Sequence, residues 1–225
     1  MQSGITNAVR GCRTQGLRFD MIANNLANVG TTGFKKDMAY FDQALRMHVT
    51  PNLSQGNIRG TGNPLDVALE GEGFFKVQTP AGIRYTANGR FHLNAEGLLV
   101  TAEGDPVLGS SGPISIQGKE ITIDDSGRIE VDESAVDRLS IASFQRPERL
   151  EKEGSSYYIY NGDEEEISEP QQTSVRQGYV EESNVVVTEE MIRMVEALRR
   201  FESYQKVLET FDETDARVVN EVGKP

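Results

Sequence analysis

The 225-residue sequence has little of what disulfide-linked, metal-binding and membrane proteins depend on. It contains one cysteine, Cys12, so no disulfide can form within the chain, and its two histidines are too few for a metal cluster of Cys and His ligands. No stretch approaches the roughly 18 apolar residues of a membrane span. The N-terminus has no apolar signal-peptide core. We therefore expect no insertion into a membrane and no cleaved signal.

The chain also has fewer basic than acidic residues, with 23 Lys or Arg against 35 Asp or Glu. The formal net charge is −12, a balance that repels phosphate backbones, so we expect no nucleic-acid partner. The charge is uneven along the chain. Residues 1–36 hold five Lys or Arg and one Asp, whereas residues 188–225 hold six Lys or Arg and nine Asp or Glu. Opposite charge favours pairing of an N-terminal with a C-terminal segment.

The first segment has the spacing of a helix that packs on other helices. Small or apolar residues alternate three and four apart, with polar Gln15 in the one missing position: Ile5, Ala8, Cys12, Phe19, Ile22 and Leu26. Gly30 and Gly33 are expected to end this helix. Cys12 lies on the heptad stripe without a histidine nearby in sequence, so a small buried side chain is favoured over a nucleophile.

An asparagine group follows near the end of this helix, at Asn24, Asn25 and Asn28. Asn24 and Asn28 lie one helical turn apart. Buried amides beside a packing stripe fix register and partner number, and we favour that role over simple termination of the helix.

The last segment repeats the heptad more strongly, over residues 188–222, with Thr188 as the expected N-cap. One heptad, broken only at Asp215, collects Met194, Ala197, Phe201, Tyr204, Leu208, Phe211, Val218 and Val222. A single helix of this length has nothing of its own against which to bury the stripe, so we expect it to pack on another helix.

Between these segments the apolar period changes to two, which is typical of strands. Hairpins are predicted at residues 74–86, 91–100 and 121–131, two of them closed by a turn ending in glycine. Residues 65–182 are therefore predicted to form an antiparallel β domain. Residues 34–47 are interpreted as a short helix or loop, and the glycines up to Gly62 indicate a flexible connection.

We find no cofactor or catalytic motif. Asp124–Gly127 lacks the spacing of a calcium loop and is interpreted as a hairpin turn. The acidic run 163–166 is interpreted as a solvated loop, with a metal or basic-partner site as the alternative. Nothing singles out a pair of carboxylates, so hydrolysis by a β-fold periplasmic enzyme is a remote alternative.

Three sequence motifs follow one another along the chain. Residues 23–36 (ANNLANVGTTGFKK) resemble the N-terminal signature of the bacterial flagellar rod and hook protein family. Residues 63–75 (NPLDVALEGEGFF) resemble the segment that opens its central β domain. Residues 178–185 (GYVEESNV), followed by residues 190–192 (EMI) and 199–202 (RRFE), resemble its C-terminal signature.

The resemblance implies a mainly β central domain, antiparallel and hairpin-rich, flanked by N- and C-terminal α-helices that pair as a coiled coil in the assembled tube. It further implies a structural subunit of the flagellar basal-body rod that transmits torque from motor to hook. Expected partners are copies of itself, other rod proteins and the flagellar type III export apparatus. Both ends are expected to be disordered until assembly, and the subunit would reach the periplasmic rod without a cleaved signal.

Within the family, the 29 residues between Gly33 and Asn63 look too few for the insertion of distal rod proteins, which favours the proximal rod type. A distal rod or other hook–basal-body paralogue is the alternative. The expected divisions are a helix over 1–33, a connection over 34–64, the β domain over 65–182 and a helix over 183–225. The candidate assembly-interface residues are Ile5, Cys12, Phe19, Ile22, Asn24, Asn25, Leu26, Asn28, Met194, Leu198, Phe201, Tyr204, Leu208 and Phe211.

Overall fold

The computed structural model describes residues 2–42 and 46–222, with side chains described for residues 4–42 and 46–214. The chain divides into two compact units. The helical unit takes residues 1–27, 37–49 and 186–225, and the β unit takes residues 28–36 and 50–185. The sequence predicts divisions at residues 33, 64 and 182. The predicted connecting segment, residues 34–64, is instead divided between the two units.

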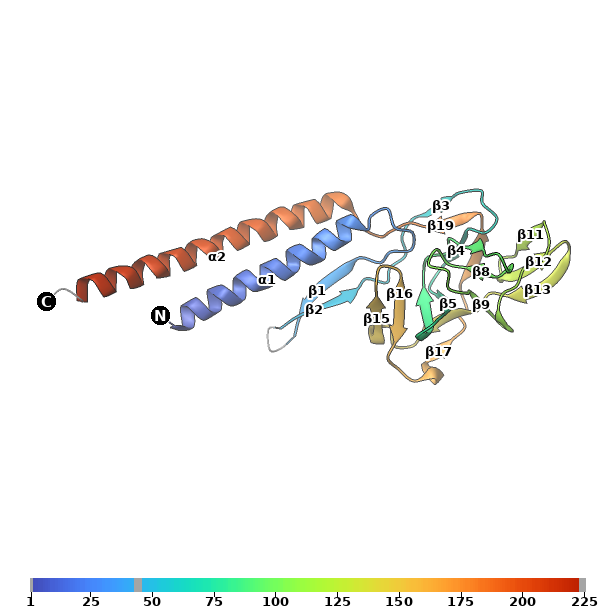
Figure 1. The fold of residues 1–225 in the computed structure, drawn as a ribbon, viewed down its shortest axis with the longest axis horizontal. Coiled ribbons are helices and arrows are strands. Elements are labelled where there is room, and N and C mark those ends of the chain that lie inside the picture. The colour runs from blue at the N-terminus through green and yellow to red at the C-terminus, as the bar shows by residue number, and fades with distance from the viewer. Residues whose placement is uncertain (1, 43–45, 223–225) are drawn as a thin grey trace. The chain divides into compact units, whose positions relative to one another are not determined.

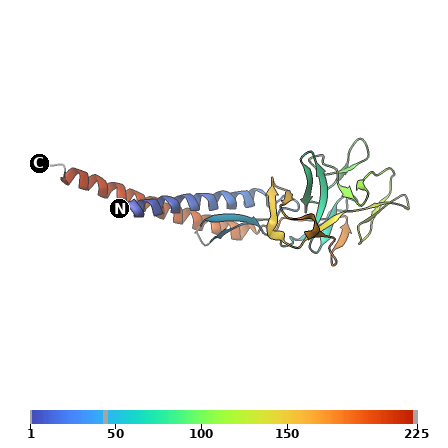
Figure 2. The same ribbon diagram turned by 90° about the horizontal axis from the view of Figure 1, so that it is seen from below.

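The helical unit contains two helices and a hairpin. The helices are α1 (Gln2–Ala27) and α2 (Val187–Val222), and the hairpin pairs β1 (Asp37–Phe41) with β2 (Met47–Pro51). Figure 1 and Figure 2 both show α1 and α2 running side by side. The sequence predicts both helices correctly, but α2 begins at Val187, so Thr188 lies in its first turn and is not its cap. The heptad positions Val218 and Val222 lie outside the residues whose side chains are described.

The prediction of a helix or loop over residues 34–47 is wrong, because β1 occupies its centre. The hairpin is held by ring contacts that single-residue propensities do not reveal. Tyr40 stacks on His48 with ring centroids 5.2 Å apart, and the Arg18 guanidinium of α1 lies 5.0 Å from the centre of the Phe41 ring. Tertiary contacts therefore decide the conformation of this segment.

The β unit consists of short antiparallel strands in several small sheets. A six-stranded sheet has the order β15–β16–β6–β5–β14–β17 and is accompanied by a three-stranded sheet, β11–β12–β13. The strands of the six-stranded sheet are β15 (Leu150–Glu153), β16 (Tyr157–Tyr160), β6 (Gly82–Thr86), β5 (Phe74–Thr79), β14 (Ile141–Phe144) and β17 (Ile167–Ser168). Those of the three-stranded sheet are β11 (Ile121–Ile123), β12 (Arg128–Val131) and β13 (Ser134–Arg138).

The other pairs are two-stranded. They are β18 (Ser174–Gln177) with β4 (Val67–Glu70), β19 (Tyr179–Glu181) with β3 (Ile58–Gly60), β7 (His92–Leu93) with β8 (Leu99–Val100), and β10 (Gly112–Pro113) with β9 (Leu108–Gly109). One-turn 3-10 helices cover Pro147–Arg149 and Glu164–Glu166. The antiparallel β fold is thus confirmed.

All three predicted hairpins are present. β5 pairs with β6, β7 with β8, and β11 with β12. The turns of the last two end at Gly97 and Gly127, whose φ angles are +79° and +80°. Glycine reaches this left-handed region without the steric cost that a Cβ brings, so the two similar turns have one physical cause.

The β unit has a main apolar core with a smaller aromatic layer beside it. The main core includes Phe75, Leu99, Ile114 and Ile129, each almost fully buried. The smaller layer packs Phe74 edge-on against the buried ring of Tyr158 at a centroid distance of 5.3 Å. Burying each such side chain contributes about 1.5–3 kcal/mol, so both clusters stabilise the β unit.

Two of the predicted loops are more ordered than expected. The supposed flexible connection before residue 64 contains β3, which pairs with β19, so chain segments far apart in sequence meet there. The acidic run is not wholly solvated, because Glu166 is buried. Its carboxylate accepts a hydrogen bond from the Tyr160 hydroxyl at 2.5 Å and pairs with the guanidinium of Arg146.

Candidate assembly interface

The two helices of the helical unit meet along one stripe of each. Among the described side chains of α2, those that are not exposed alternate four and three residues apart: Glu190, Met194, Ala197, Phe201, Tyr204, Leu208 and Phe211. On α1, Ala8, Gln15 and Ile22 are buried at heptad intervals. This spacing keeps one face of each helix turned toward the other, as in a coiled coil.

Glycines of α1 let aromatic rings of α2 lie close to its backbone. A Cβ at Gly11 would lie 2.5 Å from Cε1 of Tyr204, and one at Gly4 would lie 2.8 Å from Cζ of Phe211. Positions nearer the start of α1 therefore face positions nearer the end of α2. The helices are antiparallel, and these pairs fix their register.

Asn25 lies at the other end of this stripe and is fully buried. Its Nδ2 donates to the backbone oxygen of Asp37 at 2.9 Å and to Oε2 of Glu190 at 3.3 Å. Its Oδ1 accepts from the Asp37 N–H at 2.8 Å. Glu190, also fully buried, accepts at Oε1 from Arg193 at 2.8 Å. One amide therefore ties α1, β1 and α2 together, at a place where an unpaired polar group would be costly.

The other two asparagines of the group lie elsewhere. Asn24 is exposed on the side of α1 away from the stripe, and Asn28 follows the end of α1, where its Oδ1 accepts from the Thr31 hydroxyl at 3.2 Å. Asn24 and Asn28 therefore do not form a pair of buried amides beside the stripe. The polar contact within the stripe is made by Asn25.

The structure places most of the other predicted interface residues on the stripe or at its edge. Ile22 is buried, and the rest are half-buried: Ile5, Cys12, Phe19, Leu26, Met194, Phe201, Tyr204, Leu208 and Phe211. Leu198 differs, because 44% of it is exposed. Their contacts within the chain do not test whether they also bind a neighbouring subunit, which stays a prediction.

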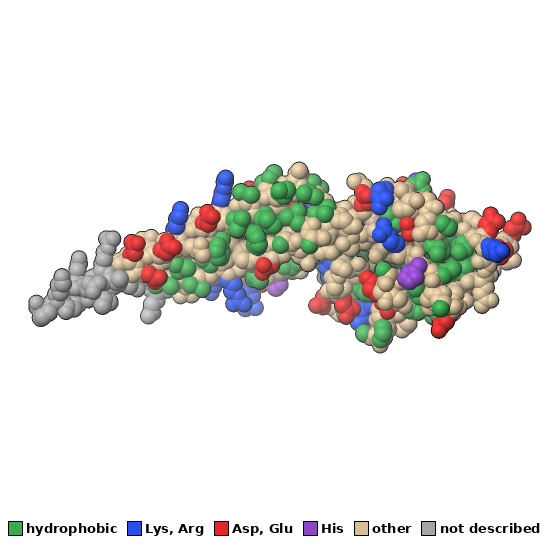
Figure 3. Space-filling view, turned by 45° about the horizontal axis from the view of Figure 1, so that its top comes forward, with side chains coloured by type: hydrophobic (Ala, Val, Ile, Leu, Met, Phe, Trp, Pro, Cys, Tyr) green, Lys and Arg blue, Asp and Glu red, His purple; other side chains and the backbone are tan. Residues whose placement is uncertain are grey.

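A second apolar surface lies on α2 beside the stripe. It consists of Val187, Met191, Val195 and Leu198, each between 41% and 56% exposed, and we call it the α2 flank. Figure 3 shows hydrophobic side chains gathered over this first part of α2 and acidic side chains farther along it. Leu198 is among the predicted interface residues, but the heptad pattern selects none of these four, because they are not on its stripe.

A cavity of about 160 Å³ opens beside the α2 flank. Its lining includes Phe19, Leu198 and Phe201, with Gly16 and Gln15. The Oε1 atom of Gln15 is buried and has no hydrogen-bond partner among the described residues. Gln15 and Asp20 are the polar residues of its lining, and the remaining side chains are apolar. The cavity lies next to a surface that the helical unit itself does not cover.

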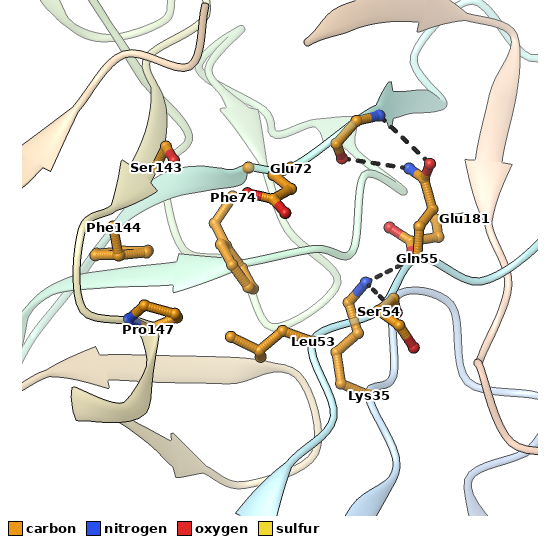
Figure 4. Close-up of a pocket in the computed structure, with 12 residues that line it drawn as sticks. Lys35, Leu53, Ser54, Gln55, Glu72, Phe74, Ser143, Phe144, Pro147 and Glu181 are labelled. Atoms are coloured by element: carbon orange, nitrogen blue, oxygen red, sulfur yellow. Dashed lines mark hydrogen bonds and ion pairs between the residues drawn. The ribbon is translucent and has the colours of Figure 1, made fainter. Parts of the chain in front are cut away.

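In the β unit, a buried ion pair joins the motifs from the two ends of the chain (Figure 4). Lys35 Nζ lies 2.6 Å from Oε1 of Glu181, and each side chain is only 5% exposed. Lys35 also donates to the Ser54 backbone oxygen at 3.2 Å, while Oε1 of Glu181 accepts from the Gly56 N–H at 2.7 Å. Three chain segments are therefore fixed at one point.

The backbone strengthens the same junction. The Gly33 N–H donates to the Glu181 oxygen at 2.8 Å, and the Lys36 N–H donates to Oδ1 of Asn184 at 2.7 Å. A Cβ at Gly33, where φ is +67°, would lie 2.4 Å from the Asn88 nitrogen, so the close approach requires glycine. The N-terminal and C-terminal motifs thus form one local structure, which their positions in the sequence do not reveal.

A cavity of about 440 Å³ adjoins this junction, lined by residues that include Leu53, Phe74, Phe144 and Pro147. Its charged lining residues include Lys35 and Glu181, which are paired with each other.

Among the described residues no group of three or more Asp, Glu, His or Cys is placed to hold a metal ion. Likewise, neither described helix is apolar enough over sufficient length to cross a bilayer.

Three family models match the chain in order. "Flagella basal body rod protein" matches residues 5–35, "Flagellar hook protein FlgE/F/G D1 domain" matches residues 68–133, and "Flagellar basal body rod FlgEFG protein C-terminal" matches residues 176–221. The first and last cover α1 with the Lys35 segment and most of α2, so they contain both sides of the helical stripe.

Full-length relatives agree with these matches. The chain is 34% identical to flagellar basal-body rod protein FlgF of Caulobacter vibrioides, with 91% of each chain covered. It is 30% identical to FlgF of Mesorhizobium japonicum, with 83% of each covered. It is 27% identical to flagellar basal-body rod protein FlgG of Bacillus subtilis, with 98% of this chain and 99% of that one covered.

Proposed function

Because the chain belongs to the FlgE/F/G family of flagellar hook and basal-body rod proteins, we propose that it serves as a rod subunit assembling through its helical unit. The family makes it a structural component of the basal body. In our proposal, α1 and α2 build the inner layer of the tube, the β unit lies outside that layer, and the assembled rod transmits torque from motor to hook.

The observation that carries this proposal is the pair of helices itself. Its stripe is closed by Asn25 and by the glycine–aromatic contacts, yet the α2 flank stays exposed. A helix pair that is complete along one face and apolar on another has a surface left for subunit contacts. An enzyme would instead need reactive groups brought together, and the relatives are named as rod proteins.

Deletion of residues 1–27 tests the proposal. The β unit begins at residue 28 and keeps its Lys35–Glu181 pair, so the truncated protein should stay folded and soluble. It should be missing from purified basal bodies, and cells that carry it as their only copy should not swim. The full-length chain with the same tag is the control. Normal incorporation of the truncated chain would refute assembly through the helical unit.

We further propose that the chain is of the proximal, FlgF type. In support, the alignment with FlgG of Bacillus subtilis spans 261 residues, more than the 225 present here, so that relative carries segments that this chain lacks. Labelled protein should be found at the motor-proximal part of isolated rods. A label confined to the hook-proximal part would instead support the distal paralogue.

We propose that the subunit reaches the periplasmic rod through the type III export apparatus without a cleaved signal, and that its helical ends become ordered on assembly. Limited proteolysis of the verified monomer should then remove the chain before residue 28 and after residue 186. It should spare residues 28–36, because Phe34 and Lys35 are buried in the β unit. Full protection of both ends would contradict the proposal.

We propose a structural role without catalysis. Purified protein incubated with peptidoglycan should release no soluble fragments beyond a buffer control. Turnover of the glycan by the pure chain would contradict this proposal and revive the hydrolase alternative.

A further inference from the structure

A polar residue, Gln15, occupies the middle of the stripe on α1, between buried Ala8 and Ile22. Gln15 is only 7% exposed, and its Oε1 atom is buried without a hydrogen-bond partner among the described residues. The other buried amide of this stripe, that of Asn25, makes three hydrogen bonds. When the helices pair, the Gln15 oxygen gives up its hydrogen bond to water and gains none in return, so Gln15 weakens the pairing.

The space around Gln15 is also incompletely filled. Two cavities of the helical unit, of about 160 Å³ and about 270 Å³, both have Gln15 and Ala197 in their lining. Side chains beside a cavity lack the van der Waals contacts that a filled space would provide. The middle of the helix pair is therefore less well packed than the part where the Tyr204 ring lies against Gly11.

The glycines of α1 weaken the same part of the helix. α1 has three glycines in 26 residues, whereas α2 has none in 36. Gly4 and Gly11 make room for aromatic rings of α2, but a Cβ at Gly16 would have no heavy atom beyond its own stretch of helix within 4 Å. Packing within the chain therefore does not require glycine at position 16, although glycine destabilises a helix interior relative to alanine. The adjacent residues Gln15 and Gly16 thus both disfavour the paired helix.

We propose that Gln15 and Gly16 keep α1 from pairing stably with α2 in the free subunit, so that the helical unit closes only when assembly adds further contacts. The inference rests on the proposed function, in which the helical ends become ordered on assembly, and it names the residues that delay this ordering. Glycine in place of alanine lowers the ratio of paired to unpaired chains about fivefold, and one unsatisfied buried acceptor lowers it by a similar factor or more. A pair that closed earlier would have to open again before export.

The double variant Gln15→Leu with Gly16→Ala tests this inference in the full-length chain. Leucine is similar in size to glutamine and needs no hydrogen bond, and alanine favours the helix. We expect amide hydrogen exchange over residues 2–27 of the verified monomer to be at least about threefold slower than in the wild type, because the paired state becomes the major one. The helical signal in far-ultraviolet circular dichroism should increase in parallel.

The matched control is the double variant Arg13→Leu with Gly30→Ala. Arg13 is exposed on α1, and Gly30 follows the end of α1 with open space around it, so neither change alters the stripe. The control should exchange over residues 2–27 as fast as the wild type. Equal slowing in the control and in the Gln15 and Gly16 variant would overturn the inference, because the position of the changes would then not matter.

The remaining outcomes separate this inference from the proposed function. Fast exchange in the wild type and in the double variant alike would overturn the inference and leave the proposed function standing. Strong protection of the wild-type ends would instead refute ordering on assembly, and the inference with it. Should the double variant associate, Gly16→Ala alone is measured as a monomer and should slow the exchange about twofold. An unchanged rate in that variant would overturn the inference.

Discussion

Removal of the Glu181 carboxylate should strongly destabilise the β unit, because it leaves the buried Lys35 ammonium without its charged partner. Glu181 is 4% exposed and accepts from both Lys35 Nζ and the Gly56 N–H. In Glu181→Ala the buried ammonium of Lys35 keeps only the Ser54 backbone oxygen. Breaking a buried pair by removing one partner costs about 3–5 kcal/mol.

The adjacent residue provides a matched control. Glu182 also pairs with a cation, Arg59, at 2.7 Å, but these side chains are 41% and 53% exposed. An exposed pair contributes about 0.2–1 kcal/mol, so Glu182→Ala should cost under about 1 kcal/mol. The two variants remove the same chemical group from neighbouring positions, and they differ mainly in how far water reaches the partner.

Urea unfolding followed by tyrosine fluorescence measures both changes, because Tyr85 and Tyr158 are buried in the β unit. With an m-value of about 2–3 kcal/mol per molar urea, Glu181→Ala should lower the midpoint by about 1–2 M and Glu182→Ala by under about 0.5 M. The double variant Lys35→Met with Glu181→Leu should lose less stability than Glu181→Ala. Equal midpoints for the two alanine variants would refute the reasoning.

Three further predictions concern single groups. Asn25→Ala removes three hydrogen bonds from the helical unit, at about 2–3 kcal/mol, and should reduce swimming in soft agar. Gly11→Ala should lower the temperature at which isolated rods dissociate, because its added methyl group would meet the ring of Tyr204. The pKa of Asp124 should lie below its usual value in an NMR titration, chiefly because the hydroxyl of the serine two residues later donates to it. The stability from this depressed pKa is complete above the unfolded pKa and is lost as pH falls through the folded one; a normal titration would refute it.

The elements that the sequence predicts correctly are those decided by neighbours in sequence. The hairpins ending at Gly97 and Gly127 need only a local alternation and one residue that accepts positive φ. The stripe of α2 likewise needs only a heptad, and the half-buried positions follow it over its described length. Local patterns of this kind can be recognised in a single sequence.

The elements that it misses depend on partners far along the chain. β1 is a strand because of ring contacts with Arg18 and His48, and β3 because β19 lies beside it. The Lys35–Glu181 pair joins two motifs, and the sequence of neither motif indicates that the two are in contact. Both motifs contain many polar residues, so nothing in the sequence marks Lys35 or Glu181 as buried.

The polar group that closes the helical stripe shows the limit of spacing arguments. Spacing alone favours Asn24 and Asn28, because they lie one turn apart. Asn25 is nevertheless the residue that lies on the same side of α1 as Ala8, Gln15 and Ile22. Position 25 lies three residues after Ile22, so the helical period places Asn25 on the stripe once Ile22 is known to belong to it. The period cannot predict that Glu190 is the partner of Asn25, because Glu190 belongs to the other helix.

The closed stripe has a consequence for the assembly-interface prediction. Residues such as Phe201 and Tyr204 already contact α1 of their own chain, so packing between subunits through that stripe alone would require the pair to open. Leu198 and Asn24 are the predicted interface residues that lie on exposed sides of the helices. We therefore expect lateral assembly without opening of the helix pair to use these outer surfaces.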